Sequence, residues 1–153
     1  MHNMATRKTR IGLIITDRSI NLYTMLLHKE LSNQILNAFY EVYNELGYGF
    51  LEKVYQNALY YELKEKGLNV IPQKRCSVQY KGREVGEYFS DIIVNDEIIL
   101  ELKACESIRE EHELQLLNYL KASSIELGFV LNFGKEPEFS RKIFSNNKKN
   151  LKR

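Results

Sequence analysis

The stretch from Asp91 to Lys103 carries ionisable groups inside a long apolar run. Asp91, Glu101 and Lys103 stand among aliphatic residues that occupy both faces of two predicted strands. Burying an unpaired carboxylate is costly, and two neighbouring carboxylates cost more unless one is protonated or a cation joins them. A hard divalent metal ion together with an ammonium group removes that cost. These three residues therefore suggest a metal site that could activate water.

The register of the hairpin around this stretch decides whether the two carboxylates meet. With a two-residue loop, Val94 would pair with Glu97, and Asp91 would point to the opposite face from Glu101. With a three-residue loop, Val94 pairs with Ile98, and Asp91 lies opposite Glu101 on the same face. Cross-strand neighbours on one face stand about 5 Å apart at Cβ, a distance that one Mg²⁺ or Mn²⁺ ion can bridge. We therefore predict a three-residue connection.

Two further polar groups follow on a predicted helix that opens shortly after Lys103. Gln115 and Tyr119 are four residues apart, so they lie on one face, one helical turn from each other. Ser107 with Glu110 has the spacing of a capping box at the start of this helix. The amide and the phenol are thereby expected near a metal-bound water or a substrate phosphate.

The elements that position these groups follow from hydrophobic periodicity. Three- and four-residue steps predict an amphipathic helix over 28–46 and a second one whose buried stripe is Leu51, Val54, Tyr55, Ala58, Leu59 and Leu63. The third helix has its apolar positions at Leu114, Leu117 and Leu120. Strand-like segments fall at 69–73, 76–81, 87–94, 98–104 and 127–133. This order favours an α/β sandwich over an all-α fold.

Composition bounds the class of protein. The chain has 153 residues, a net charge of +2 and 44% hydrophobic residues, as expected for one soluble domain. Two cysteines exclude a disulfide framework and a four-cysteine zinc site built from this chain alone. The apolar run at 11–15 is too short for a membrane span. A cytoplasmic protein without a membrane partner is expected.

Charge position matters more than net charge for a nucleic-acid partner. Four basic residues flank the strands before the hairpin and could contact a phosphate backbone: Lys74, Arg75, Lys81 and Arg83. The segment 141–153 contains six basic residues and no acidic one, so it is expected to be a basic C-terminal tail. Such contacts give affinity without sequence preference.

Several of these residues together resemble a known family. Gly49-Phe-Leu-Glu52-Lys-Val-Tyr55 matches the signature for which the GxxExxY proteins are named. Asp91 with Glu101-Leu-Lys103 resembles the core of the PD-(D/E)XK nuclease superfamily, and Gln115-Leu-Leu-Asn-Tyr119 is similar to the QxxxY element of its RecB-like branch. Ser90 stands where the superfamily name has Pro.

The resemblance implies a restriction-endonuclease-like core, with a central mixed four-stranded sheet flanked by helices in the order αβββαβ. It further implies that Asp91 and Glu101 are the principal metal ligands, with the backbone carbonyl of Leu102 and with Glu52 as the first-helix carboxylate. Lys103 is then the catalytic lysine. Gln115 and Tyr119 would orient the lysine, the water or the scissile phosphate.

The function expected on this basis is Mg²⁺- or Mn²⁺-dependent hydrolysis of phosphodiester bonds, in DNA, in repair, processing or defence. One alternative is a nucleic-acid-binding or protein-interaction module without turnover, and another is a nuclease subunit that needs a second copy or a partner protein. The nuclease-like domain is expected over 26–140. Residues 1–25, which precede this domain, are expected to be a loosely held extension or not to be translated. The second case arises because Met25 could equally be the initiator.

Overall fold

The computed structural model describes residues 7–8, 14–15, 22, 26 and 28–149. The chain divides into two units, residues 1–34 and residues 35–153. In the first unit, β1 (Arg7–Lys8) and β2 (Ile14–Ile15) pair in antiparallel fashion. Most of the range 1–25, which the sequence predicts to be a loosely held extension, lies outside the described residues, as does Met25 itself.

Two helices precede the main sheet. Helix α2 (Lys29–Leu46) buries Ile35, Ala38 and Val42, as the periodicity predicts. Helix α3 (Glu52–Glu65) buries a stripe that differs from the predicted one and consists of Tyr55, Gln56, Leu59 and Leu63. The prediction of buried side chains was wrong for Leu51, which is 79% exposed, and for Val54, which is 38% exposed. Leu51 precedes the helix as its N-cap residue, so the helical period does not apply to it.

The main sheet has five strands in the order β3-β4-β5-β6-β7. They are β3 (Val70–Tyr80), β4 (Arg83–Val94), β5 (Ile98–Lys103), β6 (Leu127–Phe133) and β7 (Pro137–Ile143). Neighbouring strands are antiparallel except β5 and β6, which are parallel. The expected α/β class with a mixed sheet is confirmed, with one strand more than the four expected.

The additional strand, β7, corrects the prediction for the C-terminal segment. Arg141 and Lys142 belong to this edge strand and not to a tail, and they pair with β6. The Lys149 amine donates to the backbone carbonyls of Ser123, at 3.0 Å, and of Ile125, at 2.7 Å. Most side chains of β7 are only half-buried, so the strand lacks the strong apolar alternation by which a sequence reveals a strand. Residues 150–153 lie outside the described part.

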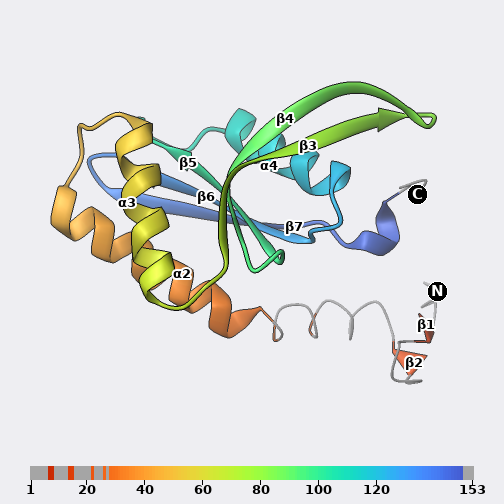
Figure 1. The fold of residues 1–153 in the computed structure, drawn as a ribbon, viewed down its shortest axis with the longest axis horizontal. Helices are drawn as coiled ribbons and strands as arrows, with labels where there is room; N and C mark the ends of the chain where they lie inside the picture. The colour runs from red at the N-terminus through yellow and green to blue at the C-terminus, as the bar shows by residue number, and fades with distance from the viewer. Residues whose placement is uncertain (1–6, 9–13, 16–21, 23–25, 27, 150–153) are drawn as a thin grey trace. The chain divides into compact units, whose positions relative to one another are not determined.

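Helices cover both faces of this sheet (Figure 1). On one face, Phe133 of β6 contacts Phe39 of α2 and stacks on Tyr55 of α3, with ring centroids 4.9 and 4.2 Å apart. On the other, Leu116 and Leu120 of α4 (Glu110–Ala122) lie in a cluster with Ile93, Ile99, Ile125 and Val130. Strand β5 is central, and its residues from Ile98 to Leu102 are buried, as predicted.

The start and the buried side of α4 differ from the prediction. Ser107 does not cap the helix; Arg109 is the N-cap residue, and its backbone N–H donates to the His112 ring at 3.1 Å. Leu114 is 51% exposed, whereas Leu116 is fully buried. The buried positions of α4 are therefore set by the sheet it packs on, which local spacing does not reveal.

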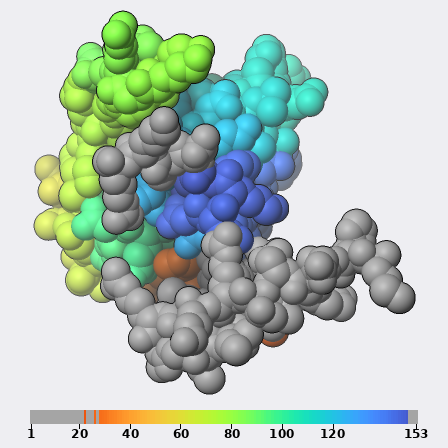
Figure 2. All heavy atoms as spheres, turned by 90° about the vertical axis from the view of Figure 1, so that its right-hand side faces the viewer, coloured from red at the N-terminus to blue at the C-terminus, as the bar shows by residue number. Residues whose placement is uncertain are grey.

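Strands β3 and β4 form a long hairpin that extends beyond the rest of the sheet (Figure 1). Strand β4 pairs with β5 only over Ile92–Val94, so its earlier residues pair with β3 alone. We call the part formed by residues 75–89 the arm; Figure 2 shows it in green beside the cyan and light blue atoms of α4. The two extended segments predicted at 69–73 and 76–81 are thus one strand, β3.

No helix in the described part of the chain combines the length and apolarity needed to cross a membrane.

Candidate nuclease site

The hairpin register brings Asp91 opposite Glu101. Val94 pairs with Ile98 and Ile92 with Leu100, so the connection contains three residues, as predicted. The turn is made by residues 95–97, of which Asn95 and Asp96 have positive φ. Continuing the same register by one step places Asp91 against Glu101.

The Asp91 carboxylate is held where β4 separates from β5. Its Oδ2 accepts the backbone N–H of Leu102 at 2.8 Å, so a side chain continues the ladder beyond the last backbone pair. The amide of Gln56, on α3, donates to the Asp91 backbone carbonyl at 3.2 Å, and Gln73 donates to Gln56 at 3.1 Å. Helix α3 and strand β5 therefore fix Asp91 from two sides.

Glu101 is a buried carboxyl group, only 5% exposed. Burial, together with the nearby negative charge of Asp91, raises the pKa of Glu101 to about 9, although the positive charge of Lys103 acts in the opposite direction. Its Oε1 is buried without a hydrogen-bond partner among the described residues. An orphaned carboxylate oxygen in this position is costly unless a cation or a proton satisfies it.

Lys103 ends β5 on the same face as Glu101, two residues away, and is half-buried. Its neighbour on β6 is Asn132, which is fully buried. The Asn132 side chain bonds both backbone groups of Cys105: its Oδ1 accepts the N–H at 3.0 Å and its Nδ2 donates to the carbonyl at 2.9 Å. Asn132 thus fixes the path of the chain directly after Lys103.

Of the two α4 residues predicted for the site, Tyr119 lies near the carboxylates and Gln115 bonds to Tyr119. The Gln115 amide donates to the Tyr119 hydroxyl at 2.5 Å. Burial raises the pKa of Tyr119, and the negative charges of Glu101 and Asp91 raise it further, so the phenol lies within the field of both carboxylates. Tyr88, on β4, stacks on Tyr119 with ring centroids 3.7 Å apart, and its hydroxyl donates to the Tyr119 backbone carbonyl at 2.8 Å.

Glu52 is the predicted site residue that is not drawn into this group. It is the first residue of α3 and is exposed, and no hydrogen bond or ion pair joins it to another described residue. It lies one helical turn before Gln56, whose amide contacts Asp91. The Tyr55 hydroxyl donates to Gly47 at 2.7 Å and accepts the N–H of Phe50 at 3.2 Å, so it ties the loop before α3 to the helix.

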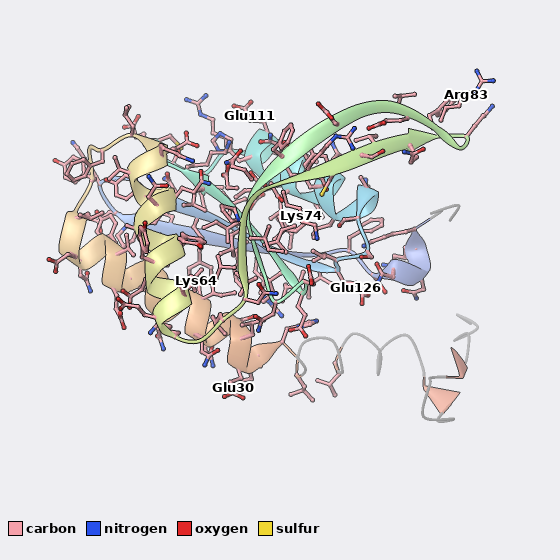
Figure 3. All side chains as sticks on the ribbon, viewed as in Figure 1. Glu30, Lys64, Lys74, Arg83, Glu111 and Glu126 are labelled. Carbon is pink, nitrogen blue, oxygen red and sulfur yellow. The ribbon has the colours of Figure 1, made fainter. Side chains whose placement is uncertain are left out.

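The four basic residues predicted to bind nucleic acid have different surroundings. Lys74 pairs with Asp96 at 3.3 Å, and Arg75 pairs with both Glu84 and Glu87 across the arm. Arg83 projects at the tip of the arm (Figure 3). Neither Arg83 nor Lys81 has a carboxylate partner among residues 28–149. The charges of Lys74 and Arg75 are thus partly offset within the protein, whereas those at the tip are not.

The donor set fits a hard divalent cation only in part. Two neighbouring carboxylates, one with an orphaned oxygen, are the ligand type that Mg²⁺ and Mn²⁺ prefer. Within the described ranges, however, no three His, Cys, Asp or Glu side chains gather closely enough to hold a metal. Mg²⁺ commonly binds through one or two carboxylates and completes its shell with water and substrate phosphate, so a pair of carboxylates is compatible with it.

Three supporting residues of the site escaped the sequence reasoning. Gln56 and Asn132 are buried polar side chains that bond to backbone near Asp91 and after Lys103, and Tyr88 holds the Tyr119 ring. Asn132 interrupts an apolar strand, which is the signal that could have indicated it, whereas Gln56 is followed by the polar Asn57 and has no such signal. Nothing in the local sequence indicates that Tyr88 stacks on Tyr119.

An α/β fold with paired carboxylates and a lysine at the end of a central strand defines a nuclease-fold protein. The chain belongs to the PD-(D/E)XK nuclease superfamily, whose family model matches residues 29–143. No curated protein matches the chain at a significant level. A solved structure titled "Crystal structure of SSO0001" aligns at 18% identity and a TM-score of 0.47, over 63% of this chain and 52% of that one. The chain thus spans about half the length of that protein.

Proposed function

We propose that this protein hydrolyses phosphodiester bonds in DNA with Mg²⁺ or Mn²⁺ as its cofactor. The observation that carries the proposal is the orphaned, buried Oε1 of Glu101 beside the Asp91 carboxylate. A binding module has no need of a buried acidic group next to a second one that repels it. The superfamily membership supports the same chemistry.

The roles of the residues follow from their positions. Asp91, Glu101 and the Leu102 carbonyl would hold the ion, and Glu52 would reach it through water or help to recruit a second one. When bound, a divalent ion lowers the pKa of water and offsets charge on the phosphate. Lys103 would hold the attacking water or donate to the negative charge that develops on the phosphate. Gln115 and Tyr119 would orient Lys103, the water or the scissile group.

The alternative is a binding module that keeps the nuclease fold but catalyses no reaction, or a nuclease subunit that needs a partner. The observation that favours it is the lack, among the described residues, of a third acidic side chain close to Asp91 and Glu101. The finer resemblances, to the GxxExxY proteins and to the QxxxY branch, belong to the proposal as well. They rest on Glu52 with Tyr55 and on Gln115 with Tyr119.

The test is incubation of the purified protein with labelled single- and double-stranded DNA and RNA, with Mg²⁺, Mn²⁺ or EDTA. Lys103→Ala is compared with Lys64→Ala, an exposed lysine on the last turn of α3. Cleavage of DNA that requires the metal, persists in Lys64→Ala and is lost in Lys103→Ala supports the proposal. Cleavage that is equal in wild type and Lys103→Ala would point to a contaminating nuclease. Metal-independent binding without cleavage would favour the module.

A further inference from the structure

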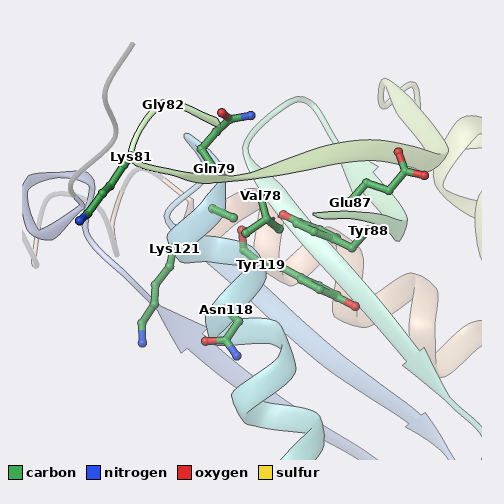
Figure 4. A pocket seen from close by; sticks show the side chains of 10 residues that line it. Val78, Gln79, Lys81, Gly82, Glu87, Tyr88, Asn118, Tyr119 and Lys121 are labelled. Atoms are coloured by element: carbon green, nitrogen blue, oxygen red, sulfur yellow. Dashed lines mark hydrogen bonds between the residues drawn. The ribbon is translucent and has the colours of Figure 1, made fainter. Parts of the chain in front are cut away.

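A groove of about 910 Å³ lies between the arm and α4 (Figure 4). Its residues on the arm include Gln79, Lys81 and Tyr88, and those on α4 include Asn118 and Lys121. The volume is at the upper end of the range for ligand pockets, about 300–1,000 Å³. It can hold a short stretch of one nucleic-acid strand but not a double helix.

The groove leads to the candidate nuclease site through Tyr119. This residue lines the groove, and its hydroxyl lies within the field of Asp91 and Glu101 and accepts from Gln115. A polymer lying in the groove would therefore lie next to the residue whose hydroxyl is in the field of the two carboxylates. Tyr88 and Tyr119 both line the groove, with the ring of Tyr88 buried against that of Tyr119.

The charges of the groove suit a phosphate backbone. Lys81 lies on the arm and Lys121 on α4, so the two amines come from opposite walls (Figure 4). Each amine lies over an aromatic ring, Lys81 over Tyr80 at 5.4 Å and Lys121 over Phe144 at 5.3 Å, and neither has a carboxylate partner within the described residues. The acidic lining residue, Glu87, accepts from Arg75, which offsets its charge.

We infer that this groove binds a single strand of DNA and delivers it to the carboxylates, with Lys81 and Lys121 contacting phosphates. The inference rests on the proposed function for the identity of the polymer. The exposed amides of Gln79 and Asn118 can bond to the edges of different bases, and phosphate contacts carry no sequence information, so the expected binding is tolerant of sequence. The two-residue turn Lys81-Gly82, with positive φ at both positions, fixes the tip that carries Lys81.

The test is fluorescence anisotropy with a labelled single-stranded DNA oligonucleotide in EDTA, where cleavage does not interfere. Lys81→Gln and Lys121→Gln are each compared with Lys64→Gln, which lies on α3 far from the arm (Figure 3). Losing one phosphate contact lowers the salt slope by about 0.7 and the affinity at 0.1 M salt by about fivefold. The double variant should therefore bind about 25-fold more weakly, and Lys64→Gln should bind as wild type does.

Unchanged affinity in the double variant would overturn the inference, and so would tighter binding of duplex DNA or of single-stranded RNA by the wild type. The binding readout separates this inference from the proposed function. Metal-dependent cleavage that requires Lys103, with no effect of the double variant on binding, would retain the nuclease and reject the groove. Lysine-dependent binding of single strands without cleavage would support the groove and reject the hydrolytic activity.

Discussion

Asp91 and Leu102 are joined by a hydrogen bond in which a carboxylate oxygen replaces a backbone carbonyl, at 2.8 Å. The bond lies where β4 stops pairing with β5, so it closes the ladder and at the same time fixes the carboxylate next to Glu101. A residue proposed to hold a metal ion is therefore also part of the sheet. A useful substitution of Asp91 therefore removes the negative charge and keeps an oxygen that can accept the Leu102 N–H.

Asp91→Asn is expected to abolish cleavage while the protein stays folded. An asparagine oxygen can still accept the Leu102 N–H, but the charge that would hold the cation is lost. We expect the rate of DNA cleavage in Mg²⁺ to fall by about a thousandfold, the scale seen when one electrostatic group of an active site is removed. The control is Glu111→Gln, an exposed acid on α4. Cleavage by Asp91→Asn at the wild-type rate contradicts the assignment.

The stability of the metal-free protein is expected to fall as the pH rises. The pKa of Glu101 is about 9 in the folded protein and 4.5 in the reference state, so the folded state retains a proton that the unfolded state has lost. Between these two values the free energy of unfolding should decrease by about 1 kcal/mol per pH unit. Urea unfolding in EDTA at pH 5, 7 and 8.5 measures this dependence.

Glu101→Gln provides the comparison, because an amide occupies nearly the same volume and does not titrate. Its unfolding free energy should vary less with pH and should exceed that of the wild type at pH 8.5 in EDTA. If the pH dependence of the two proteins is the same, Glu101 is not the group responsible.

Divalent cations are expected to stabilise the wild type at pH 8 and to leave Glu101→Gln unchanged. The ion offsets the repulsion between Asp91 and Glu101, which only the folded state brings together. At a concentration a hundredfold above Kd, the stabilisation is about 2.7 kcal/mol. Thermal unfolding with increasing Mg²⁺, Mn²⁺ or Ca²⁺ measures it without any substrate. An equal shift of both proteins would place the bound ion elsewhere.

Tyr55→Phe is expected to loosen the loop before α3. The Tyr55 hydroxyl bonds to Gly47 and Phe50, and the ring is fully buried. Removal of the hydroxyl therefore leaves these two loop groups without their partner. We expect a loss of about 1–3 kcal/mol in the free energy of unfolding, and faster amide hydrogen exchange at Phe50. Tyr43→Phe is the matched control, because its hydroxyl bonds to the carbonyls of Gly134 and Lys135 instead. Equal exchange at Phe50 in both variants would count against this role.

Local pattern accounts for much of the fold and for the centre of the site. Side chains alternate between the two faces along β4 and β5, and the two carboxylates are required to share one face. These two conditions select the register in which Val94 pairs with Ile98. The parallel strand Leu127–Phe133 is also found with its predicted bounds, because a continuous apolar run between polar segments indicates a buried strand. These features depend on residues close to each other along the chain.

What only the tertiary structure decided depends on contacts between distant segments. Strand β7 is half-buried and obtains its hydrogen bonds from β6, so its own sequence indicates it weakly. Gln56 approaches Asp91 and Tyr88 approaches Tyr119 across 35 and 31 residues of chain. The groove exists because β4 separates from β5 at Asp91 and continues with β3 beside α4. The sequence by itself determined which groups could do chemistry, and the packing of α3, α4 and the arm decided what surrounds them.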